Sequence, residues 1–177
     1  WGLKSNLMPL FLLSFLWSFG LSVHQVAAPL LGIEKFQIST SDIGVIFTIL
    51  GIVTAVIQFF LLSKITLIIG EKRSILIGLV VMALGLAIMP FLPIQLFLLY
   101  LVTAIFAFGS AVSRPVVTAL LSKETSEGQG ITMGTSGSFE SLGHFIGPLV
   151  AGFLFGLSAA TPFLFSTALM LGLLVFI

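Results

Sequence analysis

Residues 74–113 read SILIGLVVMALGLAIMPFLPIQLFLLYLVTAIFAFGSAVS and contain no charged side chain. A helix needs about 20 apolar residues to cross the hydrocarbon core of a bilayer, so this stretch has room for two crossings. Pro90 and Pro93 lie near its middle, and proline disfavours a helix interior but is tolerated in a first turn. The stretch therefore predicts two membrane-spanning helices, over residues 74–89 and 93–122.

The rest of the chain has the same character. Hydrophobic residues make up 58% of the 177 residues, charged residues only 7%, and the mean hydropathy is +1.27. A soluble domain carries about a quarter charged residues. Turn signals divide the remainder into spans over residues 6–31, 42–62, 128–156 and 163–177, with Ser39 and Asp42 as a capping box before the second. We expect one all-α, six-helix integral membrane domain over residues 1–177. We also expect this domain to be a piece of a longer protein, because the chain begins at Trp1 and ends in an apolar run.

Charged residues in the predicted loops indicate the orientation, because Lys and Arg near span ends remain on the cytoplasmic side. Six spans place most of these residues on one side and only Lys35 on the other. The chain is then a multi-pass protein of the cell membrane, with both ends of this segment in the cytoplasm. The basic residues are too few and too scattered for a nucleic-acid interface. The residues on the first side are Lys4, Lys64, Lys72, Arg73 and Lys123.

Polar residues recur at helical spacing on several spans. On the first span the spacing is four, four and three residues, which predicts a single face that looks inward. Similar stripes on the second, fourth and fifth spans suggest that these helices line an interior, whereas the third and sixth should face lipid. Packing of small and hydroxyl side chains between helices is the alternative explanation. The substrate-cavity candidates are Ser14, Ser18, Ser22, Gln25, Phe15, Phe19, Gln58 and Ser110.

The fifth span carries ionisable groups where hydrocarbon makes them costly. Glu140 and His144 follow Thr132 and Ser136 at intervals of four, and Glu140 lies about 18 Å into the span at 1.5 Å per residue. Transporters place substrate and ion sites near that depth. We interpret Glu140 and His144 as proton-coupling candidates, with Arg114 of the preceding span as a counter-ion or substrate anchor. A purely structural ion pair between Arg114 and Glu140 is the alternative.

Two other features of the spans concern packing. His24 is expected to be a packed or cavity-lining histidine. Residues 143–152 read GHFIGPLVAG, in which Gly143, Gly147 and Ala151 predict a groove for close helix contact and Pro148 predicts a bend. The motif ends at Gly152.

These passages resemble the major facilitator superfamily, and in particular the C-terminal half of bacterial multidrug (quinolone-type) drug/proton efflux antiporters. The likeness is strongest from Arg114 to Phe155, where the Gly143, Gly147, Pro148 and Gly152 pattern is similar to the antiporter motif of the family. The turn at Gly70, Lys72 and Arg73 resembles a degenerate cytoplasmic loop motif. The resemblance implies a 3+3 helix repeat that forms half of a twelve-helix protein, so that the missing N-terminal six-helix half is a partner. The sequence departs from some look-alikes, which carry carboxylates at the positions of Gln25 and Ala111, so proton coupling is expected either at Glu140 or wholly in the missing half.

The resemblance and the polar stripes together predict proton-coupled efflux of amphipathic drugs by alternating access. A transporter of a sugar, peptide or organic ion is one alternative, and a six-helix membrane module that moves nothing is another. The expected partners are a small-molecule substrate, protons and the bilayer. We expect neither an enzyme nor a cofactor, because the sequence shows no metal-ligand cluster and no nucleophile motif.

Overall fold

The computed structural model describes residues 7–125 and 128–175, and in these ranges the regular structure is entirely helical. The chain forms six continuous helical segments, which we call rods one to six, over residues 8–36, 40–69, 71–91, 96–124, 129–157 and 161–175. The second rod contains a π-helical turn, η1, and the third ends in a 3-10 turn, η2. The elements are α1 (Met8–Phe36), α2 (Thr40–Val56), η1 (Ile57–Leu61), α3 (Leu62–Ile69), α4 (Glu71–Ile88), η2 (Met89–Phe91), α5 (Leu96–Glu124), α6 (Gln129–Leu157) and α7 (Thr161–Val175).

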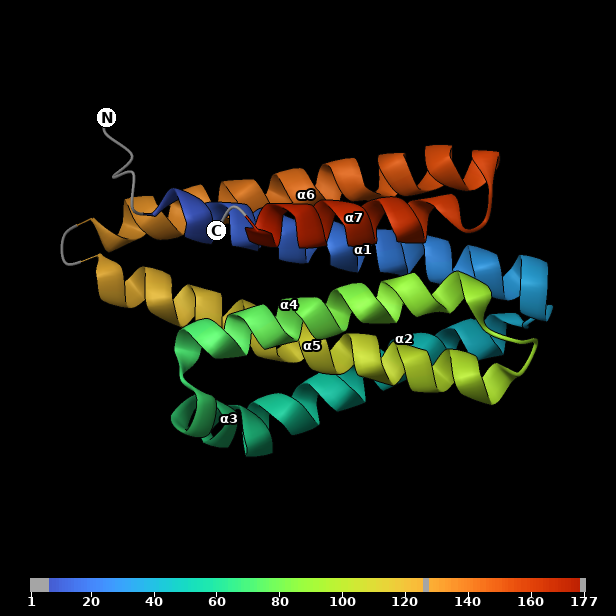
Figure 1. Cartoon of the computed structure of the whole chain (residues 1–177), viewed down its shortest axis with the longest axis horizontal. Helices are drawn as coiled ribbons and strands as arrows, with labels where there is room; N and C mark the ends of the chain where they lie inside the picture. The colour runs from blue at the N-terminus through green and yellow to red at the C-terminus, as the bar shows by residue number, and fades with distance from the viewer. Residues whose placement is uncertain (1–6, 126–127, 176–177) are drawn as a thin grey trace.

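The rods run up and down in one bundle (Figure 1). At one end α1 begins, α3 turns into α4, α5 ends, α6 begins and α7 ends; the other three connections lie at the opposite end. The α1 helix packs along α6, α4 packs along α5, and α7 contacts both α1 and α4. The α2 helix contacts mainly α5.

Five rods are long and apolar enough to cross a membrane, and the apolar part of α7, Thr161–Gly172, is shorter. The expected all-α membrane bundle is therefore confirmed as a fold class. Burial differs among the rods, since 67% of the most apolar window of α1 is buried, compared with 11% for Thr40–Ile69 and 17% for α6. Few residues in the apolar windows of the second and fifth rods are thus buried within this chain.

The second rod begins at the predicted capping box, which is confirmed. The Ser39 hydroxyl accepts a hydrogen bond from the Asp42 amide, and the Asp42 carboxylate accepts one from the Ser39 amide at 2.8 Å. Helical structure then continues to Ile69, well beyond residue 62, because the segment around Lys64 is mostly apolar. The rod ends at Gly70, whose φ of 82° lies in a region that side chains with a Cβ rarely adopt.

Glycines set the distance between α4 and α5. A Cβ on Gly78 would lie 2.9 Å from the backbone oxygen of Gly109, and one on Gly85 would lie 2.9 Å from the Phe106 Cβ. Only small residues allow helices to approach so closely. The α5 helix begins at Leu96, three residues after Pro93, because the backbone at Gln95 is extended. The α4 helix is accordingly packed on one side by α5 and α7, while its outer face is apolar; contact of this face with lipid stays a prediction.

Candidate functional site

A recess lies between α1, the second rod and α5. Its volume is about 550 Å³, within the range of about 300–1,000 Å³ typical of pockets for small molecules. The walls are mostly apolar and aromatic, with two amides and one guanidinium. Among the described residues, Arg114 is the only charged side chain that lines it. The principal lining residues are Trp17, Leu21, Gln25, Phe47, Thr54, Gln58, Phe59, Ser110 and Arg114.

The Arg114 guanidinium is held on two sides. Its central carbon lies 5.0 Å from the centre of the Trp17 ring, and its Nη2 donates a hydrogen bond of 3.2 Å to Glu140 Oε2. The Trp17 Nε1 in turn donates to the hydroxyl of Ser110 at 2.9 Å and to its backbone oxygen at 3.1 Å. The Arg114 side chain is 53% exposed and that of Glu140 only 17%. The guanidinium therefore lines the recess, and the less exposed carboxylate is its ion-pair partner.

The structure thus brings together residues that the sequence predicted to act together. Arg114 and Glu140 form the expected ion pair between neighbouring rods. His144 lies close by, with its ring edge-on to Trp17 at a centroid distance of 6.1 Å, and its Nδ1 is 2.7 Å from the Ser22 hydroxyl. No ion pair joins Glu140 to His144, so each of these two groups has a different polar partner.

Three of the predicted cavity residues lie elsewhere. Ser14, Ser18 and Ser22 are buried in the contact between α1 and α6, which we call the seam. The Ser14 hydroxyl shares a hydrogen bond of 2.9 Å with Ser136, and Ser18 donates to the Phe15 backbone oxygen. This placement corrects the prediction that they line a cavity, because α6 packs closely on this face of α1.

The glycines of the fifth rod explain how α1 and α6 approach so closely at the seam. A Cβ on Gly143 would lie 2.8 Å from the backbone of both Phe15 and Phe19, and one on Gly147 would lie 2.7 Å from the Ser22 Cβ. Ala151 on the same face is fully buried. Gly152, by contrast, lies on the exposed face with nothing within 4 Å of a Cβ. The motif therefore has two faces, one of which packs against α1, and α6 continues as a helix through Pro148.

The aromatic cavity candidates are also displaced. Phe19 is buried, and its ring stacks on that of partly buried Phe15 at 5.8 Å; neither lines the recess. Gln25, Gln58 and Ser110 do line it. Trp17 is a lining residue that the sequence pattern was not used to predict. Its signal was the spacing of four between Trp17, Leu21 and Gln25, a stripe beside that of the serines.

His24 is a packed histidine, which is one of the two roles expected for it. The ring is fully buried and stacks on Phe106 with centroids 4.2 Å apart. Neither ring nitrogen has a hydrogen-bond partner among the residues that the structure describes. Within those same residues, no three His, Cys, Asp or Glu side chains are grouped closely enough to hold a metal ion.

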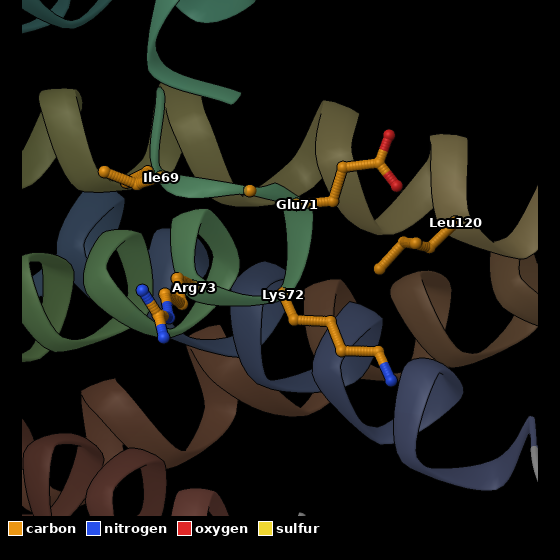
Figure 2. A pocket seen from close by; sticks show the side chains of 6 residues that line it. Ile69, Glu71, Lys72, Arg73 and Leu120 are labelled. Atoms are coloured by element: carbon orange, nitrogen blue, oxygen red, sulfur yellow. The ribbon is translucent and has the colours of Figure 1, made fainter. Parts of the chain in front are cut away.

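The predicted loop motif forms a separate hollow of about 370 Å³ at the end of the bundle where α3 turns into α4. Figure 2 shows the side chains of Lys72 and Arg73 extending in different directions from the first turn of α4. Glu71 forms an ion pair with Lys123 at the end of α5 and so ties the turn to that helix. Lys35 lies at the opposite end of the bundle, where it donates to the Pro90 backbone oxygen at 2.7 Å.

Comparison with known proteins gives a consistent result. The family model of the Major Facilitator Superfamily matches residues 10–177. Multidrug resistance protein 2 of Bacillus subtilis (strain 168) is 34% identical over 173 residues, which cover 96% of this chain and 43% of that protein. Multidrug resistance protein 1 of the same strain is 30% identical, with 94% and 43% covered. Quinolone resistance protein NorA of Staphylococcus aureus (strain COL) is 30% identical, with 85% and 39% covered. The chain therefore spans less than half the length of these relatives.

Proposed function

The chain belongs to the Major Facilitator Superfamily, and from that premise we propose that it is one six-helix half of a secondary transporter that expels amphipathic drugs in exchange for protons. The observation that carries the proposal is the recess between α1, the second rod and α5, with the Arg114–Glu140 pair at its wall. A recess of this volume with aromatic walls suits loose binding of apolar molecules. The ion pair beside it provides a carboxylate that could take up and release a proton.

The names of the relatives support efflux over uptake. Three proteins that match most of this chain are named for multidrug or quinolone resistance. We extend that activity to this chain as a proposal, because its recess has the amphipathic lining that such substrates require. A sugar carrier would be expected to have a more polar lining, since apart from Arg114 and Trp17 the recess offers only two glutamines, Ser110 and Thr54 as hydrogen-bonding side chains.

The exposed second and fifth rods support a second six-helix half as the partner. Their apolar windows are only 11% and 17% buried in this chain, yet both rods carry glycines and polar residues on the open side. We propose that these faces meet the N-terminal half, in the cell membrane, with both ends of this segment in the cytoplasm. Alternating access then arises from rocking of the two halves about the recess.

Proton coupling is proposed for the group of Glu140, His144 and Arg114. Glu140 is the carboxylate that pairs with Arg114, the charged side chain of the recess lining, and a guanidinium stays protonated in proteins. Reversible protonation of Glu140 would therefore make and break the ion pair. His144 is held by Ser22 and is a candidate to relay the proton.

Transport by the full-length protein in proteoliposomes tests this proposal. An imposed pH gradient should drive movement of a fluorescent cationic dye, and Glu140→Gln should abolish the dependence on the gradient. Lys64→Gln is a matched control, because Lys64 is an exposed charge outside the recess. Gradient-driven transport by Glu140→Gln at the wild-type rate would contradict the coupling role, and absence of transport by the folded wild-type protein would contradict the function.

A further inference from the structure

Three polar side-chain atoms are buried in the core of the bundle without a partner. The two ring nitrogens of His24 and the hydroxyl of Thr103 make no hydrogen bond to any residue that the structure describes. Both residues are 0% exposed, and the proposed function uses neither of them. A buried polar group without a partner costs stability, so such groups are normally satisfied by protein atoms or by an ordered water molecule.

His24 and Thr103 repeat a contact that the structure shows between the same two helices. Trp17 of α1 donates hydrogen bonds to Ser110 of α5. His24 follows Trp17 by seven residues and Thr103 precedes Ser110 by seven, and a step of seven residues returns to nearly the same face of a helix. Because α1 and α5 run in opposite directions, both steps lead to the same level of the bundle (Figure 1). This register places His24 and Thr103 opposite each other.

The stacking of His24 supports this register. Its ring lies on that of Phe106, with centroids 4.2 Å apart and an angle of 11° between the planes. Phe106 follows Thr103 by three residues, so the two are neighbours on the surface of α5, and an aromatic side chain in a helix leans toward the preceding turn. The nitrogens of a stacked imidazole lie in the plane of its ring. They therefore point past the edge of the Phe106 ring rather than into it.

The hydroxyl of Thr103 is not used by its own helix. Two other hydroxyl side chains of α5, those of Ser113 and Thr118, donate to the backbone oxygen four residues earlier at 2.8 and 3.1 Å. The Thr103 hydroxyl makes no such bond, although it too lies within the helix. A hydroxyl that does not bond to its own backbone retains both its donor and its acceptors for a group on the neighbouring helix.

We propose that His24 and Thr103 form a binding site for one buried water molecule, which bridges α1 and α5. Water donates and accepts at the same time, so it can satisfy an imidazole nitrogen and a hydroxyl together. Buried waters make about three hydrogen bonds, and a helix carbonyl beside the two side chains can supply the third. In the described part of the chain no cluster of His, Cys, Asp or Glu could hold a metal ion instead.

The site gives the contact between α1 and α5 a second polar level. At the first level Trp17 bonds directly to Ser110, beside the recess. At the second level, two helical turns further along α1, the bond between the helices passes through water. The inference does not depend on the proposed function, because neither His24 nor Thr103 lines the recess.

A double-mutant cycle in the full-length protein, followed by thermal denaturation in detergent, tests the inference. Thr103→Val removes the hydroxyl and keeps the shape, whereas His24→Phe removes both nitrogens and keeps a ring for stacking. Each single variant removes one partner of the water, so the melting temperature should fall by about 2–4 °C. The double variant leaves no unpaired polar side chain at the site. Its melting temperature should therefore fall by clearly less than the sum of the two single effects.

Thr118→Val is the matched control. It is the same substitution on the same helix, but its hydroxyl bonds to its own backbone at Arg114. Its effect should add to that of His24→Phe without coupling. Additive effects of Thr103→Val and His24→Phe, or equal coupling of His24→Phe with both threonine variants, would overturn the inference.

A high-resolution map of the full-length protein in lipid nanodiscs gives a second readout, which does not require the variants to fold. We expect a density peak within hydrogen-bond distance of both a His24 nitrogen and the Thr103 hydroxyl. The peak should be lost in Thr103→Val. A direct hydrogen bond between the two side chains, or a well-resolved site without the peak, would contradict a bridging water.

Discussion

The seam and the recess lie on neighbouring faces of the same helix, α1, and differ in almost every physical respect. The seam contains closely packed serines and glycines, and Ser14 and Ser22 make hydrogen bonds across the two helices. The recess has a volume of about 550 Å³, and its lining includes three aromatic side chains, two amides and a guanidinium. Polar residues on one membrane helix thus serve two purposes, and the neighbouring helix decides which one applies.

The largest difference between the two regions should be in tolerance to added volume. Gly143→Ala would place a Cβ 2.8 Å from the backbone of Phe15 and Phe19, which cannot move independently. We expect a loss of about 1–3 kcal/mol of stability. Thermal denaturation in detergent, followed by size exclusion, measures it. Gly172→Ala on α7 is the control, because nothing lies within 4 Å of its Cβ; equal melting temperatures for both variants would contradict a tightly packed seam.

The aromatic wall of the recess should show a smaller effect on stability and a larger one on activity. Trp17→Phe keeps a ring but removes both hydrogen bonds to Ser110, at a cost of about 1 kcal/mol. The freed ring should hold Arg114 less well, so that dye transport falls several-fold. Transport at the wild-type rate, with the melting temperature lowered, would mean that Trp17 serves packing alone.

The hydrogen bond between Ser14 and Ser136 sharpens the comparison further. A double-mutant cycle with Ser14→Ala and Ser136→Ala should give a coupling energy of about 0.6 kcal/mol, typical of such bonds in membrane proteins. Transport by each variant should be unchanged, because the pair does not reach the recess. A marked loss of transport in a variant of normal stability would return these serines to the substrate pathway.

The smallest effect on stability is expected for Gln58→Ala. Gln58 is exposed and lines the recess from η1, so its removal should change stability by less than about 0.5 kcal/mol. Dye affinity should change by a few-fold, since one amide of the lining is lost. Concentration dependence of transport measures this. A large change in melting temperature without a change in affinity would show that the recess lining is structural.

Composition and turn signals predicted much of the fold. The absence of charge between Ser74 and Ser113, together with Pro90 and Pro93, predicted two rods, and the spacing of Ser39 and Asp42 predicted a helix start that the structure confirms. Helix ends were less predictable. The second rod passes Lys64, because a long basic side chain at a helix end can reach the polar boundary of a membrane without ending the helix.

The candidate site was predictable in part. Spacing and depth predicted that Arg114 and Glu140 would pair, since both are costly when alone in hydrocarbon. The serines of α1 were assigned to the wrong surroundings because periodicity gives the face of a helix but not the helix that covers it. Gln25 was grouped with Ser22 at a spacing of three. It belongs instead with Trp17 and Leu21, whose face meets the recess.

The π-helical turn at Ile57–Leu61 accommodates one extra residue in the second rod. A π-helical turn holds one residue more than a regular helix needs, so it absorbs an insertion without interrupting the rod. Removing one residue there would leave a regular α-helix whose later part keeps its orientation. Related chains that are one residue shorter at this point would therefore still place Lys64 and the turn beyond it as this chain does.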